Sequence, residues 1–212
     1  MTAPQETLEL AQDVAGQSFA PLTGSPARSQ FKTIMADPPW PIKWQGGKSM
    51  GLRNLEYPTM AVAEIAEIPV KQLADNDCTL ILWVTNGHLP DGLALTRLWG
   101  FNYEKLFTWC KNNGVGGRPR NATEHFIIAT KGTPPRQFDR HESALLNWIE
   151  LPRGRHSEKP REFYPLVESF TLGPRVELFA RRRQPGWAVW GNELPNDVEL
   201  VPENDNSATL VA

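Results

Sequence analysis

Short apolar runs divide the middle of the chain into alternating strands and helices. The segment Phe31–Ala36 ends in a continuous apolar run, which predicts a central buried strand. Similar short runs, rich in β-branched or aromatic residues, predict further strands at 79–85, 103–110, 124–130, 145–151, 175–181 and 185–190.

Three segments between these runs have helical patterns. Residues 58–73 predict a short helix followed by a turn, with Thr59 as the N-cap. A second helix, which Gly100 ends, is marked by Leu93, Leu95, Leu98 and Trp99. A third has one apolar face and must hold Pro165 in its first turn or be kinked by it; the face is formed by Phe163, Leu166, Val167 and Phe170. The strand, helix and strand over 79–110 form a βαβ pattern, so we expect a mostly parallel sheet.

The two ends of the chain differ from this middle part. Residues 1–30 are rich in Ala, Pro, Gly, Ser and Thr, which predicts a flexible arm. Residues 196–212 are acidic and poor in apolar side chains, which predicts a flexible tail. The 212 residues therefore indicate one domain at 31–195, large enough to bury a sizeable core.

Composition narrows the class of protein. Hydrophobic residues make up 40% and charged residues 22%, as in soluble globular proteins. The net charge of -2 gives no global basic field, so any nucleic-acid binding must depend on local patches. The two cysteines and four histidines have no disulfide or metal-ligand spacing, so no metal is expected. No apolar stretch reaches 18 residues and no signal peptide is evident, which favours the cytoplasm over membrane or export.

The chemistry concentrates in Asp37-Pro38-Pro39-Trp40, directly after the first strand. Prolines stiffen the loop and remove two N–H donors, which leaves carbonyls free to accept hydrogen bonds. A carboxylate, a carbonyl and an indole face suit a flat ring with an exocyclic amine, because the oxygens accept both amine hydrogens while the indole stacks on the ring. The alternative is a Pro-rich turn with a packing tryptophan. Ligands bind at strand ends in open α/β sheets, which supports the site.

Two glycine-containing loops carry basic residues and no acids. Residues 41–55 include Lys43, Lys48 and Arg53, and residues 111–120 include Lys111, Arg118 and Arg120. Both are candidate substrate loops that touch phosphates or splay bases, with plain surface connectors as the alternative. The second loop lacks the Gly-x-Gly-x-x-Gly spacing of a dinucleotide site.

The Asp-Pro-Pro-Trp motif after an apolar strand resembles motif IV of the permuted (β-class) adenine amino-methyltransferases. The detail is similar to the MT-A-type family, named after the catalytic subunit of the messenger-RNA adenosine methyltransferase, in a bacterial or phage member. The similarity runs from residue 31 to residue 194. Further stretches match in order at 56–60, 80–85, 99–101, 109–112, 124–125, 157–160, 176–181 and 190–193.

This resemblance implies a permuted class I methyltransferase: an α/β, Rossmann-like fold with a mostly parallel sheet and helices on both faces. It implies S-adenosylmethionine as cofactor, bound by the half that follows Asp37. Lys159 resembles the lysine that pairs with the cofactor carboxylate, and Glu177 an acid that accepts ribose hydroxyls. The remaining cofactor positions are matched by Asp37, Arg181, Arg183, Asn192 and Glu193.

The sequence also departs from the family pattern. Arg183 stands where the family often has histidine, and Glu193 where it often has glutamine. The family usually has an acid upstream of Phe31 that holds the cofactor adenine, and residues 21–30 supply none. We therefore expect either that Ser29 and Gln30 hydrogen-bond the adenine edge or that the adenine pocket is more open.

The activity implied by the resemblance is methylation of the 6-amino group of adenine in nucleic acid. Asp37 and the Pro38 carbonyl would orient the amine, Trp40 and Tyr57 would hold the ring, and Glu124 would lie near the target pocket. DNA is favoured over RNA, because family members of this size are typically bacterial or phage proteins that modify DNA. The alternatives are an RNA enzyme, an inactive family member that binds nucleic acid or acts as a scaffold, and a small-molecule methyltransferase. A second subunit, identical or different, is a further open question.

Overall fold

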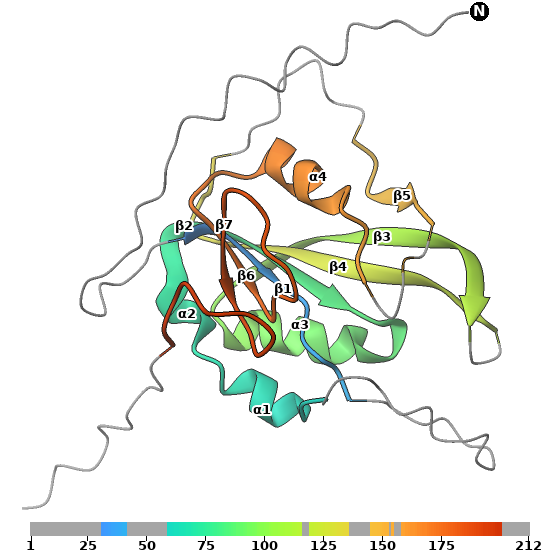
Figure 1. The fold of residues 1–212 in the computed structure, drawn as a ribbon, viewed down its shortest axis with the longest axis horizontal. Helices are drawn as coiled ribbons and strands as arrows, with labels where there is room; N and C mark the ends of the chain where they lie inside the picture. The colour runs from blue at the N-terminus through green and yellow to red at the C-terminus, as the bar shows by residue number, and fades with distance from the viewer. Residues whose placement is uncertain are drawn as a thin grey trace, which may run out of the picture.

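The structure, a computed structural model, describes residues 31–41, 59–115, 119–135, 145–152, 154 and 158–200. Within these residues the strands form one sheet in the order β5-β3-β4-β2-β1-β6-β7 (Figure 1). The strands are β1 (Phe31–Ala36), β2 (Ala74–Val84), β3 (Asn102–Val115), β4 (Asn121–Lys131), β5 (Trp148–Glu150), β6 (Arg175–Leu178) and β7 (Trp187–Trp190). Lys43, Tyr57 and Arg118, three of the predicted substrate residues, lie outside the described residues.

The sheet is mostly parallel, as the strand and helix pattern predicted. β2, β1, β6 and β7 run parallel to one another, and β5 runs parallel to β3. β4 is antiparallel to both β2 and β3. The predicted βαβ unit has the expected direction, but its two strands are not neighbours, because β4 pairs between them. The mostly parallel sheet confirms the predicted Rossmann-like fold class.

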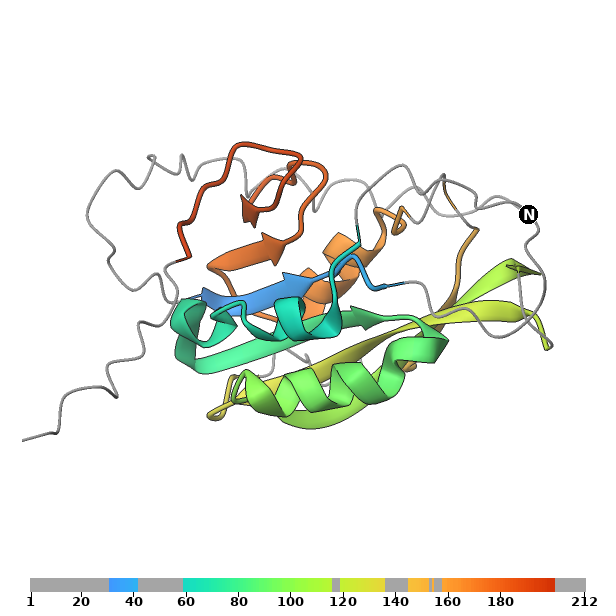
Figure 2. The same ribbon diagram turned by 90° about the horizontal axis from the view of Figure 1, so that it is seen from below.

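The helices cover both faces of the sheet. The elements α1 (Val62–Ala66), α2 (Val70–Leu73) and α3 (Leu89–Leu98), with the short 3₁₀ helix η2 (Asn86–His88), follow β1 and β2 in sequence. In Figure 2, α1 and α3 lie in front of the sheet, and α4 (Phe163–Phe170) lies behind it. α1 begins after Ala61 rather than Thr59, because the Glu64 side chain accepts the Ala61 N–H at 2.6 Å and caps the first turn. α3 ends before Gly100, whose φ of 82° suits glycine.

Two apolar cores occupy the two faces, because successive strand residues point to opposite sides. Ile34, Leu80 and Leu82 pack under α1–α3, whereas Met35, Ile81 and Trp83 pack under α4. The second core is unusually aromatic. Its rings come from Trp83, Phe107, Trp109, Phe126, Phe163, Tyr164, Phe170 and Trp187.

Two boundaries differ from the sequence prediction. The basic segment expected as a loop from residue 111 is largely strand: β3 continues to Val115 and returns through β4 as a long hairpin. The segment from residue 196 packs on the domain as far as residue 200. Asn196 and Asp197 accept the Gly191 and Val189 N–H groups, and Val198 is buried. These backbone anchors, invisible in its polar composition, hold the segment against β7.

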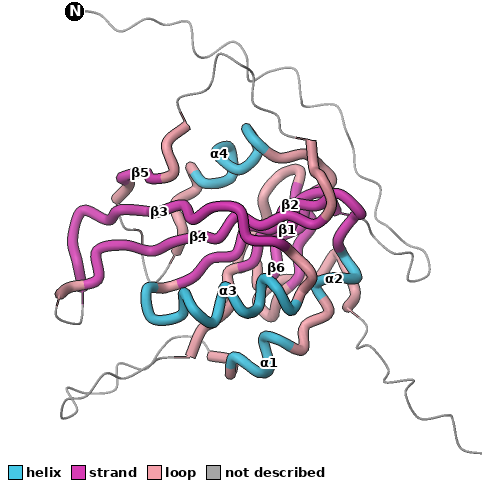
Figure 3. Tube along the Cα trace, turned by 180° about the vertical axis from the view of Figure 1, so that it is seen from behind, coloured by secondary structure: helices cyan, strands magenta, loops and turns pink. Residues whose placement is uncertain are grey.

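The connections change direction between the neighbouring strands β1 and β6. From β1 the chain leaves through α1 and α2 to β2, on one face of the sheet, whereas β6 is reached from α4 on the other face (Figure 3). In open α/β sheets, ligands bind at the carboxyl ends of the strands where the winding direction changes in this way. Asp37 follows β1 at this point.

Candidate active site

A pocket of about 290 Å³ lies at the carboxyl ends of β1 and β6. The two strands, the end of β2, the start of α4 and the segments flanking α4 and β6 all contribute to its wall. Its lining consists of Met35, Asp37, Trp83, Glu158, Lys159, Pro160, Phe163, Tyr164, Glu177, Phe179, Arg181 and Arg182. The mixture of aromatic faces, carboxylates and cations in one cavity is typical of a site for a polar ligand with a flat ring.

Asp37 stands at the rim of this pocket and is paired with Lys159. Its backbone N–H donates to the Leu178 carbonyl, which fixes the end of β1 against β6. The Lys159 ammonium donates to both oxygens of the Asp37 carboxylate at 2.8 Å. The pair is only partly exposed, with side-chain exposures of 22% for Asp37 and 16% for Lys159. Two residues predicted from separate motifs are therefore direct neighbours.

Lys159 is the centre of a chain of alternating charges. Its ammonium also lies 3.4 Å from Glu124, whose other oxygen accepts a hydrogen bond from Lys111. Burial alone would raise the pKa of Glu124, but the ammonium groups of Lys159 and Lys111 outweigh it and hold that pKa below its ordinary value. Burial opposes the charge of Lys159, whereas Asp37 and Glu124 raise its pKa above the ordinary value. These neighbours therefore favour the charged forms of both Glu124 and Lys159.

Aromatic rings lie against both lysines of this chain. The Lys159 ammonium lies 5.1 Å from the centre of the Trp83 ring, and that of Lys111 lies 4.7 Å from the Trp109 ring. The Lys111 side chain is only 9% exposed. Lys111, predicted as a phosphate contact on a loop, is thus held inside the hairpin by Glu124 and Trp109.

The sequence suggested that the carbonyls of the Pro-Pro loop are free, but both accept hydrogen bonds in the structure. The Pro38 carbonyl accepts the Trp40 N–H at 2.8 Å, and the Pro39 carbonyl accepts the Met60 N–H at 2.9 Å. The tight turn made by the two prolines brings each carbonyl to a nearby donor. A carbonyl oxygen has two lone pairs, so each retains capacity for one further hydrogen bond.

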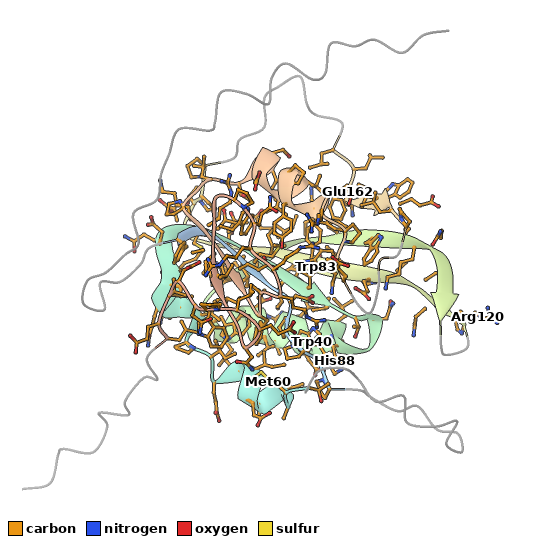
Figure 4. All side chains as sticks on the ribbon, in the orientation of Figure 1. Trp40, Met60, Trp83, His88, Arg120 and Glu162 are labelled. Atoms are coloured by element: carbon orange, nitrogen blue, oxygen red, sulfur yellow. The ribbon has the colours of Figure 1, made fainter. Side chains whose placement is uncertain are left out.

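Trp40 is placed differently from the prediction. We expected its indole to present a face to a target base, but the side chain is buried in the core beneath α1–α3. Its Nε1 donates to the Trp83 carbonyl at 2.9 Å, and its ring stacks on His88 (Figure 4). In this position the ring has apolar neighbours and its single N–H donor has a partner, which explains why the ring turns inward.

Glu177 lies in the wall of the pocket and is buried. Its Oε2 accepts a hydrogen bond from the Tyr164 hydroxyl at 2.7 Å. Burial raises the pKa of Glu177 to about 7, against the smaller opposite effect of the Tyr164 hydrogen bond. Burial and the Glu177 charge in turn raise the pKa of Tyr164. A buried acid that titrates near neutrality in a cavity is a mark of a functional site.

The chain after β6 turns sharply into the pocket. Phe179 has a φ of 62°, a strained conformation for a residue other than glycine, and its ring lines the cavity. Arg181 and Arg182 follow it in the lining. Arg182 donates to the Lys159 carbonyl at 2.9 Å and to Glu158, and its guanidinium lies 5.3 Å from the Tyr164 ring.

Arg183 and the residues after β7 do not line the pocket. Arg183 pairs with Asp197 at 2.8 Å and donates to the Pro195 carbonyl, on the surface. Asn192 and Glu193 are exposed, with Glu193 3.6 Å from Arg181. The cavity thus includes Arg182 rather than the predicted Arg183, because side chains of adjacent residues point in different directions.

Arg120 is exposed at the hairpin end, far from the pocket (Figure 4). Sequence reasoning gave no site role to eight lining residues, Met35, Trp83, Glu158, Pro160, Phe163, Tyr164, Phe179 and Arg182. The available signals were weak: Trp83 reads as part of an apolar strand and Phe163 as part of a helix face. Tyr164 gave a better one, because its hydroxyl requires a partner when buried.

The pocket fits S-adenosylmethionine by the chemistry of its lining. The carboxylate of Glu177 suits a ribose diol, the cations Lys159 and Arg182 suit a carboxylate, and the aromatic walls suit a sulfonium ion. The half of the fold that supplies these groups follows Asp37 in sequence, as a permuted chain requires. Fold and pocket together define a class I methyltransferase.

Comparison with known proteins gives the family. The sequence model of the MT-A70 family matches residues 31–193. The chain belongs to the MT-A70 family, whose methyltransferases act on the N6 position of adenine and use S-adenosylmethionine. This confirms the resemblance predicted from the motifs.

Relatives include proteins of very different length. The Type II methyltransferase M.MunI of Mycoplasma sp is 30% identical over 197 residues, which cover 82% of each chain. A probable N(6)-adenosine-methyltransferase MT-A70-like protein of Oryza sativa subsp. japonica is 32% identical, over 82% of this chain but 24% of its own length. The human N(6)-adenosine-methyltransferase catalytic subunit METTL3 is 29% identical, over 94% of this chain and 37% of its own.

No helix in the described part of the chain has the length and apolar character needed to cross a membrane.

Proposed function

We propose that this protein transfers a methyl group to the 6-amino group of adenine in DNA. The observation that carries the proposal is the position of Asp37, a partly exposed carboxylate at the rim of a cavity suited to S-adenosylmethionine. When bound, this cofactor supplies an electrophilic methyl group on its sulfonium. The task of the chain is then to hold the adenine amine in line with that methyl group, since positioning supplies much of the rate.

Asp37 and Pro38 would orient the amine. Although Lys159 donates to both Asp37 oxygens, each carboxylate oxygen keeps a further lone pair that accepts an amine hydrogen. The remaining lone pair of the Pro38 carbonyl would accept the second amine hydrogen, so that the two acceptors together would orient the nitrogen lone pair. Trp40 and Pro39 shape this loop from below rather than stacking on the base.

On the cofactor side, Lys159 and Arg182 would hold the carboxylate end, Glu177 would accept ribose hydroxyls, and Arg181 would line the entrance. Glu124 would support the target pocket indirectly by fixing Lys159. Asn192 and Glu193, exposed beside Arg181, would contribute at the rim. Tyr57 and the basic residues Lys43, Arg118 and Arg120 would act on the polymer.

DNA is favoured by the similar length of M.MunI, a Type II methyltransferase. M.MunI matches this chain over most of both proteins, whereas the adenosine methyltransferases match through a small part of their length. In duplex DNA the adenine must be flipped out, which costs a few kcal/mol, so single-stranded or distorted sites should react best.

The test is transfer of radiolabelled methyl from S-adenosylmethionine to single- and double-stranded DNA and RNA, followed by nucleoside mass spectrometry. Wild type and Asp37→Ala are run side by side. Label in 6-methyladenine from DNA, lost in the variant, is the expected result. Label from RNA alone would overturn the DNA assignment. Cofactor binding in calorimetry without transfer to any polymer would indicate a missing partner, and absence of both would favour the scaffold alternative.

A further inference from the structure

His88 is buried between the loop that carries Asp37 and the start of α3. Its ring centre lies 5.0 Å from that of Trp40, with the two planes 17° apart (Figure 4). The side chain is only 4% exposed. The η2 turn after β2 places it there, with the His88 N–H donating to the Thr85 carbonyl. His88, which follows β2, thus covers Trp40, which follows the neighbouring strand β1.

Both ring nitrogens of His88 face acceptors. Nδ1 lies 2.7 Å from Oδ2 of Asp91 on α3, and Nε2 lies 2.7 Å from the Pro41 carbonyl. Neither a carboxylate nor a carbonyl can donate a hydrogen, so each nitrogen must carry one for both bonds to form. Only a ring with a hydrogen on each nitrogen makes both bonds at once. Asp91 pairs with that form of the ring, and the indole of Trp40 offers it a π face.

The loop after β1 needs donors from elsewhere to hold it. Prolines occupy positions 38, 39 and 41, so three residues have no N–H group. The loop is instead anchored through its carbonyls: Met60 donates to Pro39, and His88 donates to Pro41. The indole of Trp40 adds its bond to the Trp83 carbonyl. His88 is the side chain that fixes the last residue of the described loop.

We propose that His88 is a positioning residue for methyl transfer: its ring, which contacts partners through both nitrogens, holds the 37–41 loop against α3 and so sets the direction of the Asp37 carboxylate. The catalytic part of this inference rests on the proposed function. The anchoring part does not, and it can be measured on the protein without any turnover.

The substitution that isolates the hydrogen bonds is His88→Phe. It keeps a flat ring over Trp40 and removes both donors. Asp91→Ala removes the partner of Nδ1 on α3 and leaves the ring itself in place. The matched control is His125→Phe on β4, where the ring bonds to Thr108 and Asn86 and does not contact the loop.

Two readouts follow. In His88→Phe, kcat at saturating cofactor should fall on the order of 10- to 100-fold while the dissociation constant of S-adenosylmethionine stays within about twofold. His125→Phe should keep kcat within about twofold of wild type. By hydrogen exchange, the Trp40 and Met60 amides should exchange faster in His88→Phe, with the β2 amide of Ile81 unchanged.

The α3 partner of the ring separates positioning from packing. Asp91→Ala should lower kcat and speed exchange at the Trp40 amide, because the ring loses its anchor on α3 while its stacking on Trp40 is kept. Asp91 is the charged group that contacts His88 among the described residues, and Trp40 and Pro41 supply the other contacts.

Wild-type kcat in His88→Phe, or wild-type exchange at Trp40 and Met60, would overturn the proposal. If His88→Phe fails to fold, Asp91→Ala decides alone, and wild-type kcat with wild-type exchange at Trp40 in that variant would overturn the proposal. If wild type transfers no methyl group to any polymer, the proposed function fails, but the exchange experiment still tests the anchoring by His88.

Discussion

Lys159 donates hydrogen bonds to both carboxylate oxygens of Asp37, at 2.8 Å each, across 122 positions of sequence. The acid proposed for the target amine and the lysine proposed for the cofactor carboxylate therefore belong to one electrostatic unit, which Glu124 and Lys111 extend into the β3–β4 hairpin. Changes at the cofactor side should consequently be felt at the target side.

Asp37→Asn tests the carboxylate with almost no change of shape. We expect methyl transfer to fall by about 100-fold or more. The asparagine amide keeps only one acceptor oxygen, and its NH2 group faces the Lys159 ammonium, which is also a donor. The rate of label transfer measures this, with far-UV circular dichroism to verify the fold. Asp75→Asn at the opposite end of β2 is the control. Asp37→Asn activity above about a tenth of wild type would contradict the role assigned to Asp37.

Lys159→Met and Lys111→Met form a second comparison, because both lysines pair with Glu124 but only Lys159 lines the pocket. Lys159→Met should weaken S-adenosylmethionine binding about 10-fold or more, since it removes a cation and leaves two carboxylates together. Lys111→Met should keep cofactor affinity. Isothermal calorimetry distinguishes them, and equal losses in the two variants would show that Glu124 rather than Lys159 controls binding.

The buried acid Glu177 should make stability depend on pH. Its pKa in the folded protein, about 7, lies above the ordinary value of 4.5, so the folded state binds the proton more tightly. The free energy of unfolding should therefore be highest below about pH 4 as far as this group is concerned, and fall by up to roughly 3 kcal/mol as the pH rises through 7. Urea titrations across this range check the slope. In Glu177→Gln this dependence of the free energy of unfolding on pH should disappear. If the variant keeps the same dependence as wild type, another group is its cause.

Ligand binding should show the opposite trend with pH. Ribose hydroxyls donate to the carboxylate form of Glu177, so affinity for S-adenosylmethionine should increase between about pH 6 and about pH 8. Calorimetry at several pH values measures this. A flat profile would remove Glu177 from the ribose contact.

Arg182 and Arg183 provide a test with adjacent, chemically identical side chains. Arg182→Gln should weaken cofactor binding, because its guanidinium ties Glu158 and the Lys159 carbonyl to the pocket wall. Arg183→Gln should leave affinity unchanged and cost less than about 1 kcal/mol of stability, because its pair with Asp197 is half exposed. Affinity lost in Arg183→Gln instead would favour the position inferred from the family pattern.

Trp40→Ala should act on the fold rather than on base binding. The buried indole fills the core beneath α1–α3 and donates to Trp83, so its removal should cost about 3–5 kcal/mol in the free energy of unfolding. Chemical denaturation measures the loss. A variant of wild-type stability that binds its target polymer weakly would restore the stacking role first expected from the sequence.

Much of the molecule follows from local patterns in the chain. The apolar run before Asp37 specifies a buried strand, the spacing of Phe163, Val167 and Phe170 specifies the face of α4, and Gly100 specifies where α3 ends. These features depend on residues close in sequence, and so they could be predicted. The motifs likewise identified the family and placed Asp37, Lys159, Glu177 and Arg181 among the site candidates, and the structure brings these four into one pocket.

The tertiary structure decided in which direction side chains point and which residues distant in sequence they contact. Nothing near Trp40 indicates that its ring turns into the core and stacks on His88, 48 positions later, or that Arg182 rather than Arg183 faces the cavity. The insertion of β4 between β2 and β3 and the packing of Asp197 against β7 also lie beyond local patterns. Such choices depend on which buried donors and charges find partners once the whole sheet has formed, and only the folded chain brings those groups together.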